Sequence, residues 1–391
     1  EVMAAELHSF ANFVYQSPTQ LCYGKGACEE IAKRKLIPEG ARVMMLYGGG
    51  SIKRNGVYEE VLKYVTPVCE FAGIEPNPHA ETCHKAVALA KEKKVDYFLA
   101  VGGGSVIDAT KYIALAMEWT KTDDTFDLFS MPKDIVPAKI PIGVVLTIPA
   151  TGTETNNLFV VTHFERKAKC LGCHDSIKPA FAIVDPCHSF SLPIQQVING
   201  VIDSYVHVIE QYIGHYDMSE VVDRYCEATL KVITHAGPLT IKDPKNYKHR
   251  ADFCLAATYA LNGILGTGVR QCWAAHMIGH EVTTYYDVAH GASLAMTCPA
   301  VMRFHKEKNA KKLAQLAERV FGVQNATAQD GIDQTVKFFE SIGGITHLQQ
   351  RTPKCGPEHF EEIAVKFAKT PIGAHKDIFH DECIKILNDM L

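Results

Sequence analysis

Residues 96–108 read Asp96-Tyr97-Phe98-Leu99-Ala100-Val101-Gly102-Gly103-Gly104-Ser105-Val106-Ile107-Asp108. The apolar run up to residue 101 predicts a buried strand, and the three glycines end it. A helical pattern then extends from Ser105 to about Glu118. A strand, a glycine turn and a helix in this order are typical of one repeat of a doubly wound parallel sheet.

The same alternation continues on both sides of this stretch. We predict further strands at residues 42–47, 68–71, 142–148 and 181–184, and helices at 57–64 and 78–94, the second capped by Asn77. Three glycines, Gly48-Gly49-Gly50, also follow the first of these strands. Alternating strands and helices at this spacing predict an α/β domain over residues 1–187, built on a doubly wound parallel sheet that binds a dinucleotide.

The pattern changes after Asp185-Pro186. Strand signals largely vanish, and helical periodicity covers residues 193–214, 219–236, 250–265 and 271–285 and continues toward Leu391. We therefore predict an all-helical domain over residues 188–391. No low-complexity linker separates the halves, so we expect them to pack closely and to share a cleft.

Composition excludes several classes of protein. The chain has 391 residues, a 47% hydrophobic content and a formal net charge of −4, so it offers no basic field for nucleic acid or an anionic membrane. No apolar run reaches the ~20 residues of a membrane span, and no basic-then-apolar leader is visible. The thirteen cysteines are scattered, mostly through apolar stretches. That usage predicts reduced thiols and a cytoplasmic location.

The two glycine loops are candidate cofactor sites. Gly102, Gly103, Gly104 and Ser105 lead into a helix, where free backbone N–H groups favour a pyrophosphate. A tight turn without a ligand explains this loop equally well. The loop Gly48-Gly49-Gly50-Ser51-Ile52-Lys53-Arg54 has no carboxylate to repel a 2′-phosphate, and Ser51 and Lys53 are possible donors to one. A solvated basic turn is the alternative there.

A third candidate follows the strand at 142–148. Its end and the turn Pro149-Ala150-Thr151-Gly152-Thr153-Glu154 are rich in hydroxyl groups, including those of Thr147 and Thr151. Hydroxyls at the carboxyl end of a strand suit phosphate or ribose binding. A capped turn would have the same composition.

The helical half contains a candidate metal site. Asp203 and His207 are spaced i, i+4, as are His276 and His280, and His290 follows. This spacing puts both members of a pair on one helix face. A carboxylate with several imidazoles suits a divalent metal. Each histidine alone is more often an ordinary core or surface residue, and spacing does not say whether His276 or His280 is the ligand.

The segment Cys170-Leu171-Gly172-Cys173-His174 matches the attachment pattern of a c-type haem. Haem attachment belongs to exported or organellar chains, and nothing here directs export. A chance loop sequence is the favoured interpretation, with a haem or redox carrier as the alternative.

Taken in order, these motifs resemble those of the iron-containing (group III) alcohol dehydrogenase family, and within it the butanol dehydrogenase and NADPH-dependent aldehyde reductase branch. The resemblance covers nearly the whole chain. It begins at Pro18-Thr19 and Tyr23-Gly24-Lys25-Gly26 and includes Gly73-Ile74-Glu75-Pro76-Asn77-Pro78 and the loop with Asp108 and Lys111. It ends with Asn199-Gly200-Val201-Ile202-Asp203 and the stretch from His276 to Gly291.

The resemblance implies an oxidoreductase that moves a hydride between NADP(H), or NAD(H), and a small aldehyde or alcohol. It implies Fe²⁺ or Zn²⁺ held by four residues: Asp203, His207, His276 and His290. His280 then falls near the substrate and the nicotinamide, and Lys169 near the cofactor phosphates. Asp108 and Asn156 fall near the cleft, and we take His280 and Asp108 as candidate catalytic residues.

Two further expectations accompany this interpretation. We expect a homodimer. The rival within the same architecture is a metal-dependent cyclase or lyase of the dehydroquinate-synthase type, which binds a polyanionic substrate and makes no net redox change. Apolar residues around the predicted metal ligands, such as Trp273, Met277 and Ile278, argue against that rival.

Overall fold

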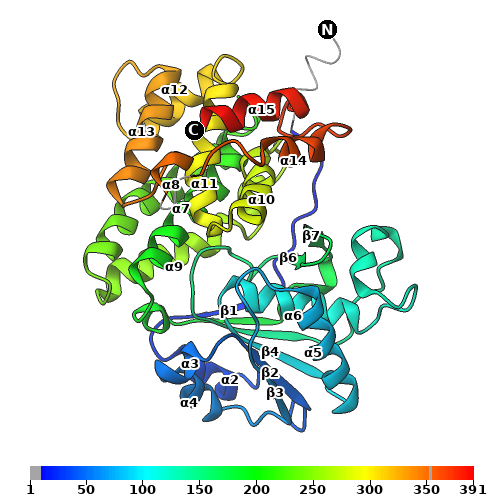
Figure 1. The fold of residues 1–391 in the computed structure, drawn as a ribbon. Coiled ribbons are helices and arrows are strands. Elements are labelled where there is room, and N and C mark those ends of the chain that lie inside the picture. Colours follow the sequence, from blue (N-terminus) through cyan, green and yellow to red (C-terminus); the bar gives the residue numbers. More distant parts are fainter. Residues whose placement is uncertain (1–9, 352–354) are drawn as a thin grey trace. The chain divides into compact units, whose positions relative to one another are not determined.

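The computed structural model describes residues 10–351 and 355–391. It consists of two compact units. One, here the α/β unit, spans residues 16–192. The other, here the helical unit, joins residues 193–391 with the segment 10–15. We predicted a boundary near residue 187, and in the structure the two units meet in the sequence between Leu192 and Pro193. Figure 1 shows both units.

A six-stranded sheet forms the centre of the α/β unit, and each pair of adjacent strands within it is parallel. Its order is β1-β8-β5-β4-β2-β3. The strands are β1 (Gln20–Tyr23), β2 (Val43–Tyr47), β3 (Cys69–Phe71), β4 (Tyr97–Gly102), β5 (Ile142–Leu146) and β8 (Phe181–Val184). From β2 the chain builds outward to β3, and from β4 it builds the other way to β5. In such sheets ligands bind at the carboxyl ends of the strands where the order reverses, here β2 and β4.

Apolar residues cover both faces of this sheet, as expected for buried parallel strands. Val43, Met45 and Tyr47 of β2 face a cluster that includes Ile31 and Val61 from the helices α2 and α4. The alternate residues lie on the face packed by α6. The helices of this unit are α2 (Glu30–Lys33), α3 (Ser51–Arg54), α4 (Val57–Leu62), α5 (Ala80–Glu92) and α6 (Gly104–Ala116).

Two local expectations were wrong. Asn77 does not cap α5, because the residue before that helix is His79 and Asn77 has a left-handed φ of 54°. The segment from Cys170 is not a loop. Residues 168–173 form the strand β7 (Ala168–Cys173), which pairs antiparallel with β6 (Leu158–His163).

The helical unit is built around α7 (Ile194–Tyr212), nearly all of whose residues after Val197 are buried. A helix that is buried on every side lies at the centre of a core, and a large cluster of buried apolar residues in this unit includes α7. The other helices are α8 (Glu220–Lys242), α9 (Tyr247–Ala260), α10 (Ala274–Tyr286), α11 (His290–Phe304), α12 (Ala310–Arg319), α13 (Ala328–Ser341), α14 (Phe360–Ala364) and α15 (His380–Asp389).

Candidate metal centre and cofactor loops

Three helices of the helical unit bring the predicted metal ligands together. Asp203 and His207 lie one turn apart on α7, His276 lies in the first turn of α10, and His290 begins α11. The start of α11 approaches α7 so closely that a Cβ on Gly291 would lie 2.3 Å from the backbone oxygen of Asn199. Only a glycine permits this approach, and the approach places His290 beside Asp203.

One carboxylate oxygen is the meeting point of these side chains. The Nε2 atoms of His207, His276 and His290 lie 3.6, 3.7 and 3.5 Å from Oδ1 of Asp203. These separations exceed a hydrogen bond. They resemble the spacing of two ligand atoms on one tetrahedral metal, about 3.4 Å for bonds of about 2.1 Å.

Burial and missing partners support the same interpretation. Ligand atoms of Asp203, His276 and His290 all lie within 4.8 Å of one another, and His207 joins this set through Asp203. Within residues 10–351 and 355–391, Oδ1 of Asp203 and Nε2 of His276 are buried and make no hydrogen bond. Burying polar atoms without a partner costs free energy. The donor set therefore fits a divalent cation.

Glu210 is a buried residue of this centre that we did not predict. Its carboxylate accepts hydrogen bonds from the backbone N–H groups of Ala275 and His276, at 2.7 and 3.1 Å, and lies 2.5 Å from Nδ1 of His276. The sequence did contain a signal: Glu210 follows Asp203 by seven residues and His207 by three, which puts all three on one face of α7.

The local field favours positive charge. Burial opposes ionisation of Asp203, yet His207, His276 and His290 together hold its pKa below the usual range. Burial likewise opposes a charge on His276, but the carboxylates of Asp203 and Glu210 raise its pKa to about 9. A cation placed among these groups would meet a net attraction.

His280 lies beside the centre. Its ring centroid is 5.1 Å from that of His290 and 6.4 Å from that of His276, and the side chain is partly exposed. Trp273 approaches from the start of α10, with its ring 5.3 Å from that of His276. An indole ring therefore lies against the candidate metal-ligand histidines on this side.

The loop after β4 is closely packed. Side-chain atoms of Val106, Ile148 and Thr151 lie within 2.5 to 2.9 Å of the positions that a Cβ on Gly102, Gly103 and Gly104 would take. Such close packing of strand, turn and helix is one of the roles of glycine in dinucleotide-binding turns. Ser105 stands in the first turn of α6, and the backbone N–H of Thr147 donates to Gly102 at 2.9 Å.

The loop after β2 is more open. A Cβ on Gly49 would meet nothing within 4 Å, whereas Gly50 has a φ of +88° and Gly48 lies against the backbone oxygen of Ile74. Ser51 begins α3. The Lys53 ammonium lies 5.1 and 4.5 Å from the ring centroids of Tyr47 and Tyr58.

Asp108 and Lys111 fasten α6 to the turn at 151–158. The Lys111 ammonium is fully buried and donates to Thr153, Asn156 and Leu158 at 2.6–3.1 Å. Asp108 accepts from the Thr153 hydroxyl at 2.7 Å and from the Val160 N–H at 3.0 Å. Burial raises the pKa of Asp108 and lowers that of Lys111.

The remaining predicted cofactor residues lie around this turn. The Thr151 hydroxyl accepts weakly from the Thr153 N–H at 3.4 Å, and the Asn156 amide donates to Gly152 at 3.2 Å. Lys169, on β7, donates to the side chain of Asn77 at 3.0 Å. All of these residues belong to the α/β unit.

The thiols of β7 do not form a pair. Cys170 and Cys173 lie three positions apart on one strand, opposite Val161 and Leu158, so their side chains point to opposite faces of the hairpin. Neither cysteine forms a disulfide. A haem joined to both cysteines does not fit this geometry.

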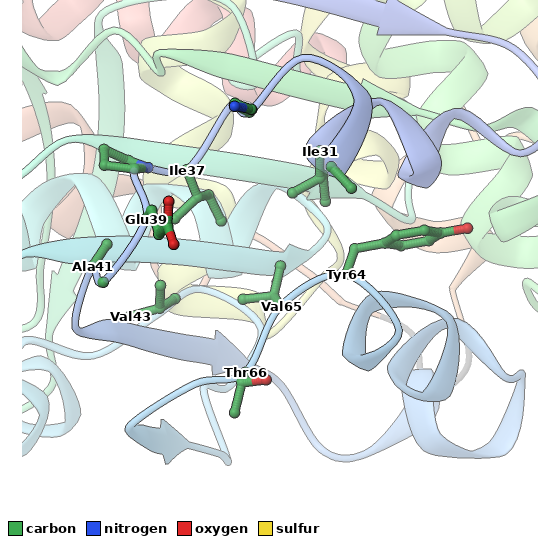
Figure 2. Close-up of a pocket in the computed structure, with 12 residues that line it drawn as sticks. Ile31, Ile37, Glu39, Ala41, Val43, Tyr64, Val65 and Thr66 are labelled. Atoms are coloured by element: carbon green, nitrogen blue, oxygen red, sulfur yellow. The ribbon is translucent and has the colours of Figure 1, made fainter.

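A surface cavity of about 340 Å³ lies elsewhere on the α/β unit. Figure 2 shows its lining, which includes Ile31, Ile37, Val43 and Tyr64. None of the predicted site residues lines it.

Comparison with known proteins identifies the family. The sequence model of the family described as iron-containing alcohol dehydrogenase matches residues 18–186. The sequence model of the C-terminal part of the Fe-containing alcohol dehydrogenase family matches residues 197–391. The chain belongs to the iron-containing alcohol dehydrogenase family. Among the relatives within this family, NADP-dependent alcohol dehydrogenase 3 of Entamoeba histolytica is 53% identical over 97% of this chain and 99% of its own length.

Other members of the iron-containing family are also similar. The NADPH-dependent aldehyde reductase YqhD of Escherichia coli is 41% identical, covering 86% of this chain and 88% of its own. A crystal structure of YqhD superposes with a TM-score of 0.94 and 38% identity, over 98% of this chain and 100% of that one. The crystal structure of NADH-dependent butanol dehydrogenase A from Thermotoga maritima superposes with a TM-score of 0.89 and 32% identity, over 98% of this chain and 99% of that one. No helix among the described residues is long and apolar enough to cross a membrane.

Proposed function

We propose that this protein is a metal-dependent, NADP(H)-preferring reductase of small aliphatic aldehydes, which also catalyses the reverse oxidation of primary alcohols. The observation that carries the proposal is the convergence of three imidazole Nε2 atoms on one buried oxygen of Asp203. The names of its relatives, an NADP-dependent alcohol dehydrogenase and an NADPH-dependent aldehyde reductase, indicate the same chemistry.

In this proposal Asp203, His207, His276 and His290 hold Fe²⁺ or Zn²⁺. A divalent ion held there would polarise a carbonyl oxygen, and reduced nicotinamide would supply the hydride. Glu210 accepts the Nδ1 proton of His276, which leaves Nε2 of that ring unprotonated and directed at the metal position. His280, partly exposed and beside His290, relays a proton to the product alkoxide.

The loops after β2 and β4 hold the cofactor. Gly102, Gly103 and Gly104 let the backbone of the α6 turn approach the pyrophosphate. Gly48, Gly49, Gly50 and Ser51 receive the adenosine end. Asp108 and Lys111 act on the cofactor through the turn they fasten. The direct catalytic role predicted for Asp108 remains a prediction.

Lys53 is a weaker phosphate donor in this proposal than the sequence suggests, because its ammonium lies over two tyrosine rings. Arg54 is better placed. Its guanidinium lies 3.9 Å from the position that a Cβ on Gly50 would occupy. We therefore assign any charge-assisted contact with a 2′-phosphate to Arg54 and to the hydroxyl of Ser51.

The assembly and location predicted from sequence form part of the proposal. Phe10, Phe13 and Val14 expose 53%, 53% and 96% of their surface, an apolar display that suits a contact with a second copy. None of the thirteen cysteines forms a disulfide with another described residue, as expected of a chain in a reducing cytoplasm. We propose a cytoplasmic homodimer on these grounds.

The decisive experiment is an aldehyde panel assayed with NADPH and with NADH on protein loaded with a defined metal. We expect butanal to exceed any sugar phosphate in kcat/KM, and chelator-treated protein to be nearly inactive. A sugar phosphate as best substrate would support the cyclase-like alternative, and full activity after metal removal would contradict the assigned centre.

A further inference from the structure

A second group of metal-ligand side chains lies in the α/β unit. Cys28 comes from the turn η1 (Ala27–Glu29), Glu60 from α4 and His188 from the turn η5 (Pro186–Ser189). Their ligand atoms all lie within 4.8 Å of one another. Nε2 of His188 is 3.0 Å from Oε2 of Glu60. Three segments distant in sequence thus contribute one side chain each.

Burial and charge make this group suitable for a cation. Cys28 is fully buried and His188 is 5% exposed, whereas the Glu60 side chain keeps 29% of its surface open. The carboxylate of Asp185 is fixed nearby by the N–H groups of Gly26 and Cys187, at 2.6 and 2.8 Å. Burial raises the pKa of the Cys28 thiol, and the charges of Glu60 and Asp185 raise it further. The group therefore lies in a negative field with an opening to solvent.

We propose that Cys28, Glu60 and His188 form a second metal site, separate from the catalytic centre, for a zinc-like divalent cation. One thiolate, one carboxylate and one imidazole are ligands that Zn²⁺ accepts, and the open side at Glu60 leaves the fourth position for water. Binding displaces the thiol proton to solvent. The bound ion joins residues 28, 60 and 188 and so stabilises the α/β unit.

The second site is the weaker of the two. At the catalytic centre Glu210 accepts the Nδ1 proton of His276. Among the described residues, Nδ1 of His188 is buried and makes no hydrogen bond. Support of this kind is typically worth about 10–100-fold in metal affinity. The site at Cys28 therefore fills after the catalytic centre and at a higher free metal concentration.

Cobalt titration of the metal-free full-length chain tests the proposal, because only the second site supplies a thiolate. We expect the first equivalent of Co²⁺ to give a spectrum without a thiolate-to-cobalt charge-transfer band, and the second equivalent to add that band. Cys28→Ser should abolish the band and lower the stoichiometry from two ions to one. Cys83→Ser, which removes another buried thiol, should leave both unchanged.

Two further variants separate this proposal from the assignment of the catalytic centre. In His207→Ala the first tightly bound ion should be lost while the thiolate band remains. His188→Gln, which keeps a donor for Glu60, should weaken the band even where Cys28→Ser folds poorly. A thiolate band that survives Cys28→Ser, or binding of a single ion by the wild-type chain with no band, overturns the second site.

Discussion

Glu210 shows how a single buried residue shapes the candidate metal centre. Its carboxylate accepts from two backbone N–H groups at the start of α10 and from Nδ1 of His276. In Glu210→Gln the amide oxygen can still accept from the N–H of Ala275, but the amide N–H₂ replaces the oxygen that faces the N–H and the Nδ1 of His276. The ring then carries its proton on Nε2, where the metal should bind. We expect the dissociation constant of the metal to rise about 10–100-fold.

Competition with a chromogenic chelator measures that constant without any assay of activity. The control is Glu227→Gln, which alters another buried carboxylate of the helical unit and should leave metal affinity unchanged. If Glu210→Gln lowers only the melting temperature of the metal-free protein and binds metal normally, Glu210 merely caps α10.

His276 and His280 are equivalent by spacing but differ in position. Nε2 of His276 lies 3.7 Å from Oδ1 of Asp203, whereas the ring of His280 lies beside that of His290. We expect His276→Ala to lose both bound metal and turnover. His280→Ala should keep most of its metal and lose about 10–100-fold in kcat. Metal analysis of both purified variants decides the matter, and equal loss of metal would reverse the assignment.

Sequence spacing singled out most of the side chains that meet at Oδ1 of Asp203, but not all of the buried residues around them. The two i, i+4 pairs and the later histidine indicated a metal site, yet His276 and His280 stayed interchangeable until the family resemblance was considered. Glu210 was missed because one acidic residue in an apolar helix looks like any buried carboxylate. Its partners are backbone groups of another helix, and those carry no sequence signature.

Among the structural elements, the loop after β2 offers a selective test of cofactor preference. Of the three glycines in this loop, only Gly49 has both space for a Cβ atom and a backbone conformation that other residues adopt readily. A carboxylate there would bind the ribose diol of NAD and repel a 2′-phosphate. We expect a wild-type ratio of kcat/KM for NADPH over NADH above one, and a fall of about ten-fold or more in Gly49→Asp.

Gly49→Ala is the matched control, because it adds the same Cβ without the charge. Its ratio should stay near that of the wild type. A wild-type ratio below one would reject the preference for NADP(H). An unchanged ratio in Gly49→Asp would show that residues outside this loop set the preference.

The central strands β2, β4, β5 and β8 were predictable because each is a continuous apolar run. The hairpin of β6 and β7 was not. Its strands are only partly buried, so neither is a continuous apolar run. We interpreted the cysteines of β7 as a possible haem motif and not as part of a strand. β1 was missed as well, because its four residues Gln20–Tyr23 are too short and mixed for a pattern. Long-range pairing with β8 makes it a strand.

At the scale of the whole molecule, acid should destabilise the helical unit. Asp223 is buried beside Lys312 and His215, at 2.5 and 3.1 Å. Burial opposes its charge, but these partners lower its pKa to about 2 from an ordinary 3.8. Because the pKa of this carboxyl is lower in the folded than in the unfolded state, its charge stabilises the fold at pH values above the unfolded-state pKa. That stabilisation is lost as the pH falls through the folded-state pKa. The shift corresponds to about 2 kcal/mol.

Urea unfolding at pH values from 6 down to about 2 measures this effect. Asp223→Asn should be less stable than the wild type at pH 6, and the difference should shrink steadily as acid protonates the wild-type carboxyl. Asp333→Asn, which changes an exposed carboxylate, should follow the wild type throughout. A difference that stays constant with pH would mean that Asp223 contributes through packing alone.

The strand β1 also has a consequence for biosynthesis. It lies at the edge of its sheet, where β8 is its one neighbour among the described strands, and residues 20–23 are paired with residues 181–184. During synthesis, β1 can therefore pair with β8 only after more than 150 further residues have been translated. Contacts of such long range slow folding. Nascent chains arrested before residue 181 should leave β1 unpaired and accessible to chaperones.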